Sequence, residues 1–421
     1  MVKNKQLKKI AVIGIGRVGL PLALVLADQN YFVYGIGRTK EKINDINKGK
    51  MPFLEKGALN LLKKTLHKTF ICTTDYSEIK NCDYIIMTLG TPVDENMNPL
   101  LNQINESLES AMPYFKTGQT LILRSTVSPK TTLYVASLLE DSGKLKIGKN
   151  FFLAFCPERI SEGKSIEEIT TIPQIIGGVD PKSALKAKEL FTSIKVETLI
   201  TDSTSAELAK LFTNMYRYIN FAISNEFMVL ANNYGKNIHE IVNLVNYKYK
   251  RGGLSLPGLT GGPCLFKDGF FLIADIPYAE LISTSWKINE SIPLFLIKLI
   301  KEKIELKHKR VALLGMSFKS EIDDIRESLS FKIRNSLLRE RAIIKMHDPY
   351  VKSYKNQIIE NNVYESFKMA DLIIVATNHA MYRKLDIAKI KFLAKKNCYV
   401  CDVWNNFNTN KVIFKLKDLS S

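Results

Sequence analysis

The chain has 421 residues, 46% of them hydrophobic and 24% charged, which is a globular composition on a chain too long for one ordinary core. No run approaches the about 18 consecutive apolar residues of a membrane-spanning helix, and the basic start MVKNKQLKKIAVIGIG lacks the apolar core and cleavage site of a signal peptide. The formal net charge is +18, but Lys and Arg are spread along the chain without a basic tail or a nucleic-acid-binding motif, so we expect a cytoplasmic protein that binds neither membrane nor nucleic acid.

The first residues predict the opening of a doubly wound nucleotide-binding fold. An apolar strand over 9–14 (KIAVIG) leads into the turn GIGRVG, a helical run (LPLALVLADQ) and a second strand (YFVYGIG) that ends near Gly37. Further apolar strands are predicted over 83–90, 119–126 and 150–157. Each ends in a polar or proline-containing turn, where open parallel sheets usually bind their ligands.

The turn carries a GxGxxG fingerprint made by Gly14, Gly16 and Gly19, with Ile15 and Val18 between them. The first glycine permits a sharp turn, the second lets a pyrophosphate approach the backbone, and the third lets the helix pack close to the strand. Because the fingerprint stands between a strand and a helix, it favours a dinucleotide site over a glycine-rich packing turn.

The second strand lacks the acidic residue that usually binds the adenosine ribose. Gly37 stands at that place, followed by Arg38. An arginine there either stacks on the adenine of NAD or accepts the 2′-phosphate of NADP, so these residues leave both cofactors open.

From about Ser203 the pattern changes to a long helix. The stretch SAELAKLFTNMYRYINFAISNEFMVLANNYG has helical spacing, no proline and a glycine at its end, which predicts a spine connecting two halves of the protein. Lys210 and Asn214 are four residues apart on this helix and share a face, so they either reach one pocket or form an exposed pair. The glycine-rich loop YKYKRGGLSLPGLTGGP then leads to Cys264, and further helices are predicted to about Lys307.

A second α/β unit begins near Arg310. Its predicted strands lie in RVALLGMSFK, IIKMHDPY, DLIIVATN and CYVCDVW, without a clean GxGxxG. We therefore predict an α/β fold of two Rossmann-like doubly wound domains joined by a long central helix and a helical domain. The predicted domains are 1–202, 203–307 and 308–421.

Cys264 stands in the tight turn GGPCLFKD, with Lys267 and Asp268 close behind it. A nearby cation favours the nucleophilic thiolate, and a carboxylate can activate water. A cysteine beside a nicotinamide cofactor suits the oxidation of an aldehyde through a thioester, whereas the alternative is a small buried cysteine in a turn. Glu158 in CPERISEG follows a strand end and suits acid–base work, or else it is a loop carboxylate paired with Arg159.

The other cysteines do not indicate a disulfide framework, because the chain is large and has no signal peptide. The lone CxxC of Cys398 and Cys401 fits a buried strand better than a zinc site, since no second pair of Cys or His accompanies it. We expect no metal. The remaining three cysteines are Cys72, Cys82 and Cys156.

These motifs, in this order, resemble the nucleotide-sugar 6-dehydrogenases, which act on UDP-glucose, UDP-N-acetylmannosamine or UDP-N-acetylglucosamine. The resemblance covers nearly the whole chain and rests on GIGRVGLPLA, TLGTPVD, RSTVSP, CPERISEGKS, PQIIGG, AELAKLFTN, LPGLTGGPCLFKD and GMSFKSEIDDIRES. It implies a two-step, NAD-dependent oxidation of the C6 alcohol of a UDP-sugar to a carboxylate, and it favours NAD over NADP.

The resemblance also implies roles for single residues. Cys264 would carry the thiohemiacetal and thioester, while Asp268, Lys210 and Asn214 would position water and stabilise the oxyanion. Glu158 would assist the acid–base steps. Thr126 would hold water beside the nicotinamide. On the cofactor side, the glycines and Arg38 are joined by Thr91, Thr126, Lys267 and Arg326. On the substrate side, the matches are Arg159, Gly261 and Lys319.

The resemblance further implies a homodimer or higher homo-oligomer built around the spine helix. Arg251 corresponds to a basic residue that reaches the sugar bound by the neighbouring subunit, with Lys248 or Lys250 as alternatives. Two positions depart from the family pattern. They are Gly37 and, in DVWNN, Trp404, which stands where relatives often have an arginine, so that uridine or phosphate contacts there are expected to differ.

The substrate is expected to be a UDP-N-acetylhexosamine such as UDP-ManNAc or UDP-GlcNAc, because CPERISEGKSIEEITTIPQIIGG is closer to that branch of the family. UDP-glucose is the alternative, since the KD after the cysteine is typical of UDP-glucose enzymes. Two other classes remain: a one-step dehydrogenase of the β-hydroxyacid or 6-phosphogluconate type, which needs no cysteine, and a catalytically inactive protein that binds nucleotide-sugars.

Overall fold

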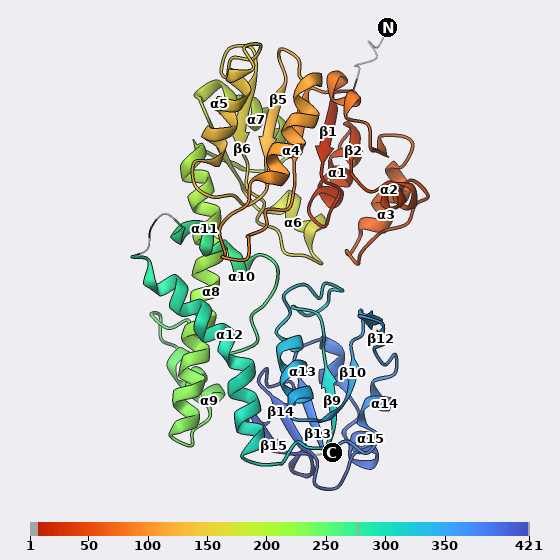
Figure 1. Cartoon of the computed structure of the whole chain (residues 1–421), viewed down its shortest axis with the longest axis vertical. Helices are drawn as coiled ribbons and strands as arrows, with labels where there is room; N and C mark the ends of the chain where they lie inside the picture. The colour runs from red at the N-terminus through yellow and green to blue at the C-terminus, as the bar shows by residue number, and fades with distance from the viewer. Residues whose placement is uncertain (1–6, 275, 277, 420–421) are drawn as a thin grey trace. The chain divides into compact units, whose positions relative to one another are not determined.

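The computed structural model describes residues 7–274, 276 and 278–419, and the chain forms two compact units. The first unit comprises Met1–Thr213 with Phe270–Ile276, and the second comprises Asn214–Gly269 with Pro277–Ser421. Each unit contains an open, mainly parallel sheet with helices (Figure 1). The expected α/β architecture of two Rossmann-like sheets and a long central helix is confirmed.

The first unit is built on an eight-stranded sheet in the order β3-β2-β1-β4-β5-β6-β7-β8, parallel except between β6 and β7. Its strands are β1 (Lys9–Ile13), β2 (Phe32–Ile36), β3 (Phe70–Thr73), β4 (Tyr84–Met87), β5 (Thr120–Leu123), β6 (Phe152–Phe155), β7 (Gln174–Gly178) and β8 (Thr198–Asp202). Its helices are α1 (Gly19–Asp28), α2 (Lys40–Asn47), α3 (Ala58–Thr65), α4 (Asn102–Ala111), α5 (Thr131–Asp141), α6 (Ser165–Thr171), α7 (Pro181–Ser193) and α11 (Phe270–Ile273).

The central strands β1, β4 and β5 are almost entirely apolar, apart from Lys9 and Thr120 at the first positions of β1 and β5, because both faces of this sheet are covered. Alternate residues of β1 enter different cores: Ile10 and Val12 belong to one buried cluster, and Ala11 and Ile13 belong to another. The chain runs outward from β1 to β2 and β3, then returns to place β4 on the other side of β1. Strand order therefore reverses between β1 and β4, where ligands of such sheets bind.

The second unit contains a five-stranded sheet in the order β10-β9-β13-β14-β15 and a small hairpin. The strands are β9 (Arg310–Leu314), β10 (Ile343–His347), β11 (Ser353–Tyr354), β12 (Gln357–Ile358), β13 (Leu372–Val375), β14 (Tyr399–Asp402) and β15 (Ile413–Lys415). The helices are α9 (Ile238–Asn246), α10 (Leu265–Asp268), α12 (Glu280–Lys301), α13 (Ser330–Arg339), α14 (Val363–Phe367) and α15 (Ile387–Leu393). Here the strand order reverses between β9 and β13.

Helix α8 (Ser203–Asn233) is the predicted spine, 31 residues long and followed by Gly235 in the left-handed region (φ 64°). Its buried residues join a hydrophobic core in each unit: Ala206 belongs to the first, and Met228 and Ala231 belong to the second. Cys398 and Cys401 are buried at strand β14, as expected.

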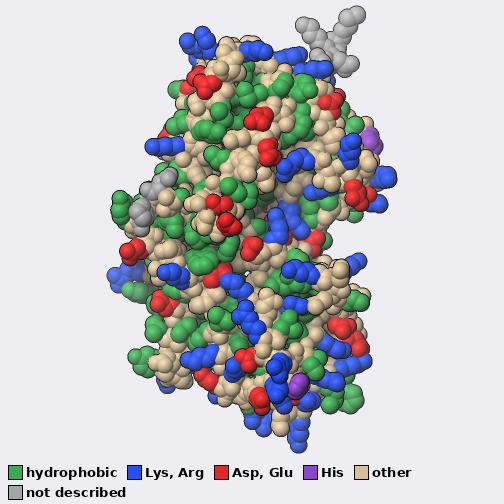
Figure 2. Space-filling view, in the orientation of Figure 1, with side chains coloured by type: hydrophobic (Ala, Val, Ile, Leu, Met, Phe, Trp, Pro, Cys, Tyr) green, Lys and Arg blue, Asp and Glu red, His purple; other side chains and the backbone are tan. Residues whose placement is uncertain are grey.

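The charged side chains are distributed over the surface as the sequence predicts. Figure 2 shows Lys and Arg side chains scattered over the visible face and interspersed with Asp and Glu. Within the described residues, no helix combines the length and apolarity needed to cross a bilayer.

Candidate active site

The glycine fingerprint has the geometry that a dinucleotide needs. Gly14 has φ +97°, and a Cβ there would lie 2.6 Å from the carbonyl oxygen of Thr88, the residue directly after the neighbouring strand β4. A Cβ at Gly19 would lie 1.9 Å from the oxygen of Gly14, so only glycine permits this approach of helix to turn. At Gly16 a Cβ would meet no protein atom within 4 Å, which leaves that backbone accessible to a pyrophosphate.

A cavity of about 220 Å³ adjoins this turn. Gly14, Ile15 and Gly16 line it, together with Gly37 and Arg38 directly after the end of β2. A Cβ at Gly37 would lie 2.8 Å from Cδ1 of Ile43, so a larger residue there requires only that the end of this side chain shifts. Arg38 is exposed and lies 3.6 Å from the carboxylate of Glu106. These residues fit the adenosine end of a dinucleotide.

Two further predicted residues of the first unit lie in loops at the carboxyl edge of the same sheet. Thr91 is buried in the loop after β4, and Thr126 is half-buried in the loop after β5. Val18 immediately precedes α1. The carboxyl edge is the side on which parallel sheets bind ligands.

Glu158 lies directly after β6 and is 8% exposed. Its Oε2 accepts a hydrogen bond from the guanidinium of Arg124, whose Nη1 donates to Oε1 of Gln174 at 2.8 Å. Its Oε1 accepts the backbone N–H groups of Arg159 (2.8 Å) and Ile160 (3.1 Å). The charged partner of Glu158 is thus Arg124, and the alternative pairing with the Arg159 side chain is wrong: that guanidinium donates to a backbone carbonyl in the loop before β7.

Helix α8 is anchored in the first unit one turn before Lys210. The carboxylate of Glu207 has no solvent exposure and accepts hydrogen bonds from the backbone of Lys130 (2.6 Å) and from the backbone and hydroxyl of Thr132 (2.8 and 2.5 Å). Burial raises the pKa of Glu207, although these hydrogen bonds act in the opposite direction. Lys210 is half-buried on the same helix, so its backbone has a fixed position.

In the second unit, Asp268 joins two other predicted residues. It is fully buried, its Oδ2 accepts the side-chain amide of Asn214 at 2.6 Å, and its Oδ1 accepts the ammonium of Lys267 at 2.9 Å. Cys264 is exposed immediately before α10, and its carbonyl accepts the backbone N–H groups of both Lys267 and Asp268. The alternative of a buried cysteine is therefore wrong. Cys264 precedes Asp268, the centre of this hydrogen-bonded cluster, by four residues.

The loop before Cys264 is held by buried amides. Asn225 of α8 exchanges two hydrogen bonds with the backbone of Gly258 (3.0 and 2.9 Å) and donates to Oδ1 of Asn289 on α12 (2.8 Å). Further along, Gly262 donates its N–H to the carbonyl of Glu327 at 3.0 Å, and a Cβ at Gly261 would lie 2.4 Å from that oxygen. Two motifs distant in sequence, LPGLTGGPC and SFKSEIDDIRES, thus pack against each other.

The remaining candidates occupy exposed or peripheral positions of the second unit. Lys319 lies half-buried in the loop after β9, and Arg326 of the same loop donates to both oxygens of Asp324 (3.0 Å each from Nε). Arg251 is exposed, with its guanidinium 5.1 Å from the ring centre of Tyr249.

Trp404, which stands where an arginine was expected, has a structural explanation. Its indole N–H donates to the carbonyl of Ala376 at 3.0 Å, and a Cβ at Gly258 would lie only 2.2 Å from its ring. The tryptophan therefore packs directly on the backbone of the loop that leads to Cys264.

Sequence reasoning missed Arg124, Asn225 and Asn289. Arg124 stands at the end of the apolar strand LIL, where an arginine can be buried only with an acidic partner, and this signal was available. Asn225 and Asn289 interrupt the apolar faces of α8 and α12, but the neighbouring residues in the sequence do not indicate which groups these amides bind. Within the described part of the chain, no group of three or more His, Cys, Asp or Glu side chains could hold a metal ion.

Comparison with known proteins adds three family matches in chain order. Residues 8–195 match the NAD binding domain of the UDP-glucose/GDP-mannose dehydrogenase family, residues 204–291 match its central domain, and residues 312–409 match its UDP binding domain.

Similar proteins cover nearly the full chain. The UDP-N-acetyl-D-mannosamine dehydrogenase of Methanococcus aeolicus is 32% identical over 97% of this chain and 93% of its own length, and that of Methanocaldococcus jannaschii is 33% identical over 96% and 94%. Among solved structures, UDP-D-ManNAc dehydrogenase from Pyrococcus horikoshii matches with a TM-score of 0.86 at 30% identity, covering 92% of this chain and 93% of that one. The UDP-N-acetyl-mannosamine dehydrogenase of Staphylococcus aureus matches with a TM-score of 0.84 at 28% identity, covering 93% of both chains.

Proposed function

The chain belongs to the UDP-glucose/GDP-mannose dehydrogenase family of NAD-dependent enzymes, and we propose that it oxidises the C6 hydroxyl of UDP-N-acetyl-D-mannosamine to the uronic acid. The observation that carries the proposal is the exposed Cys264 next to the buried cluster of Asp268, Asn214 and Lys267. The choice of sugar follows the names of relatives that cover this chain almost entirely.

When bound by the glycine fingerprint of the first unit, NAD would supply the two-electron acceptor for each of the two oxidations. In the proposal, the thiolate of Cys264 adds to the C6 aldehyde, which forms a thiohemiacetal on the protein. Loss of the second hydride from C6, with loss of the hydroxyl proton to a base, leaves a thioester. Water then hydrolyses this thioester to the carboxylate and regenerates the thiol. An exposed sulfur on a loop fixed by backbone contacts suits this repeated attack and release.

The other residues hold charges and water in this scheme. Asp268 fixes the amide of Asn214 and the ammonium of Lys267, so both donors keep one orientation during the reaction. Lys210 would stabilise the developing oxyanion, Glu158 would serve the acid–base steps, and Thr126 would hold water near the nicotinamide. Arg159, Gly261, Lys319 and Arg251 remain proposed substrate contacts, and Thr91, Lys267 and Arg326 remain proposed residues of the cofactor side.

The proposal includes a homodimer and the three-domain division at 1–202, 203–307 and 308–421. The matched family segments run close to these bounds and support them. An exposed apolar stripe on α8, made by Tyr216, Ile223, Phe227 and Leu230, supports self-association. The expected cytoplasmic location stays a prediction.

The test is an assay of the purified protein with UDP-ManNAc, UDP-GlcNAc, UDP-GalNAc and UDP-glucose, each with NAD and with NADP. We expect the highest kcat/KM for UDP-ManNAc with NAD, and two cofactors reduced per sugar, because two hydrides leave C6. A ratio of one would favour a one-step dehydrogenase. Binding of UDP-sugars without any reduction of NAD or NADP would favour the inactive binding protein. A higher kcat/KM for UDP-glucose would make UDP-glucose the substrate instead of UDP-ManNAc.

Cys264→Ser tests the covalent step. We expect it to abolish uronate formation and to leave a first-step product or a stalled adduct, because the serine hydroxyl cannot form a thioester. Cys72→Ser, a buried cysteine of the first unit, is the matched control and should still form the acid. Uronate formed at the normal rate by Cys264→Ser would refute the mechanism.

A further inference from the structure

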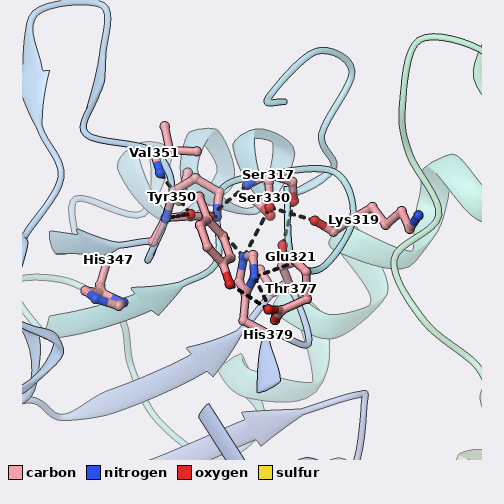
Figure 3. A network of polar contacts seen from close by, with 12 residues as sticks. Ser317, Lys319, Glu321, Ser330, His347, Tyr350, Val351, Thr377 and His379 are labelled. Atoms are coloured by element: carbon pink, nitrogen blue, oxygen red, sulfur yellow. Dashed lines mark hydrogen bonds and ion pairs between the residues drawn. The ribbon is translucent and has the colours of Figure 1, made fainter. Parts of the chain in front are cut away.

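A buried polar network joins three loops at the carboxyl edge of the sheet in the second unit. The loops follow β9, β10 and β13, and strand order reverses between β9 and β13, which is the place where open parallel sheets bind ligands. We use the name β9 loop for residues 315–327, which include Lys319. Figure 3 shows the network, with the side chain of Lys319 directed away from it.

His379, at the loop after β13, is the centre of this network and has no solvent exposure. Its Nδ1 accepts the backbone N–H of Glu321 at 3.1 Å, so the ring proton is carried by Nε2. Nε2 then donates toward Oδ2 of Asp348 (3.2 Å) and Oγ of Ser317 (3.1 Å). One imidazole thus binds two points of the β9 loop.

Asp348, after β10, binds the start of the same loop. Its Oδ2 accepts the backbone N–H groups of Met316 (2.7 Å) and Ser317 (3.0 Å), while its Oδ1 accepts that of Tyr350 (2.8 Å). Burial alone would raise the pKa of Asp348, but the hydrogen bonds from His379 and the backbone outweigh it and lower the pKa.

Ser317, His379 and Asp348 have the residue types of a hydrolase triad but not its roles. The hydroxyl of Ser317 is buried and donates its proton to the carbonyl of Lys319 at 2.8 Å, and Nδ1 of His379 is occupied by a backbone N–H. In a triad the imidazole would accept the serine proton and the carboxylate would bind its other nitrogen. The hydrogen bonds here act on the backbone of the loop instead.

The far end of the β9 loop is held as well, and it supports the catalytic loop. The carboxylate of Glu321 accepts the backbone N–H of Ala380 (2.8 Å) and the hydroxyl of Tyr350 (2.5 Å). Glu327 accepts the N–H of Gly262, two residues before Cys264. The network therefore fixes a segment that carries Lys319 and touches the loop of the proposed nucleophile.

We propose that His379 and Asp348 are positioning residues that hold the β9 loop so that Lys319 binds the anionic UDP part of the substrate. The inference rests on the proposed function, and it adds two residues that do not touch the substrate themselves. His379 acts from the β13 side of the reversal point and Asp348 acts from the β10 side, so neither loop alone fixes Lys319.

The primary test measures UDP binding by calorimetry, without sugar or NAD. His379→Ala should weaken UDP binding by up to about tenfold and raise KM for the UDP-sugar by a similar factor, with kcat changed less than about threefold. NAD affinity should stay unchanged, because the NAD-binding domain belongs to the first unit. His347→Gln is the control: His347 is equally buried, at the end of β10, and its Nδ1 lies 3.0 Å from the hydroxyl of Tyr382.

Two conservative variants separate the contacts and stand in if His379→Ala does not fold. His379→Asn keeps an acceptor at the δ position for the N–H of Glu321, and His379→Gln keeps a donor at the ε position for Asp348. Each should recover part of the UDP affinity, and Asp348→Asn should weaken it. UDP affinity within about twofold of wild type in folded His379→Ala and Asp348→Asn would overturn the inference.

A double-mutant cycle tests whether His379 acts through Lys319. Lys319→Ala alone should weaken UDP binding about tenfold, and adding His379→Ala should weaken it by less than a further threefold or so, since the contact is already lost. Fully multiplicative effects would overturn the inference while leaving the proposed function intact. Wild-type protein that binds no UDP would overturn both, so the two failures are distinguishable.

Discussion

At the scale of single residues, Glu158 shows how a strand-end carboxylate is held by a distant side chain. Arg124 is only 3% exposed and reaches it from the loop after β5, while Gln174 of β7 binds the other side of the guanidinium. A buried arginine whose partner is removed leaves an uncompensated charge, so the pair is constrained as a unit. Glu158 therefore keeps one orientation beside the cofactor domain's carboxyl edge.

Gly37→Asp should strengthen the preference for NAD over NADP. The new carboxylate would accept hydrogen bonds from the adenosine ribose and repel a 2′-phosphate, so the ratio of kcat/KM for the two cofactors should shift about tenfold or more toward NAD. Steady-state kinetics with both cofactors measures this.

Gly37→Ala is the matched control, because it brings the same Cβ within 2.8 Å of Ile43 without a charge. An unchanged cofactor ratio in Gly37→Asp would show that Gly37 and Arg38 do not set the preference. Arg38 itself lies 3.6 Å from the carboxylate of Glu106.

At the scale of elements, the loop before Cys264 depends on helices α8 and α12. Asn225 and Asn289 are both fully buried, and Asn289 also donates to the carbonyl of Tyr218 at 3.0 Å. The amides thus connect two helices and the loop by hydrogen bonds that water cannot replace. Buried networks of this kind stabilise one arrangement when every member is satisfied.

Asn225→Ala should destabilise the protein by about 3 kcal/mol, because it leaves polar groups of Gly258 and Asn289 buried without partners. Urea unfolding measures the loss, and kcat/KM should fall as the loop loses its anchor. Asn220→Ala is the control on the same helix, since the side-chain amide of Asn220 donates to the carbonyl of Tyr216 one turn earlier in α8. A loss below about 1 kcal/mol would contradict the role given to Asn225.

At the scale of the whole molecule, α8 presents an apolar stripe that a single chain leaves exposed. The side chains recur three, four or seven residues apart and are 39–76% exposed: Tyr216, Ile223, Phe227 and Leu230 of α8, and Tyr234 directly after its end. Exposed stripes of this size on a helix are typical of self-association.

Phe227→Glu combined with Leu230→Glu should convert the proposed dimer to a monomer, because two buried charges would have no partners in the interface. Sedimentation should give twice the 47.8 kDa chain mass for the wild type and the single mass for the variant. Leu185→Glu, at an apolar residue of α7 that is 54% exposed, should leave the assembly unchanged. A monomeric wild type would contradict the dimer.

The sequence by itself determined the two α/β units, the long α8, the glycine fingerprint and the glycine-rich loop that carries Cys264. These features are local: periodic apolar residues, glycines at tight turns and short motifs carry them in a few adjacent positions. The motifs also sufficed to identify the family, because their order along the chain is itself specific.

Only the tertiary structure decided which groups meet. It paired Glu158 with Arg124 rather than Arg159, placed Trp404 on Gly258, and joined Ser317, Asp348 and His379 around one loop. Such partners lie tens of residues apart, and their contact depends on the order of strands in a sheet and on which helix face is buried. Local sequence patterns do not specify either of these, because the groups come into contact only when the hydrophobic cores of the protein form.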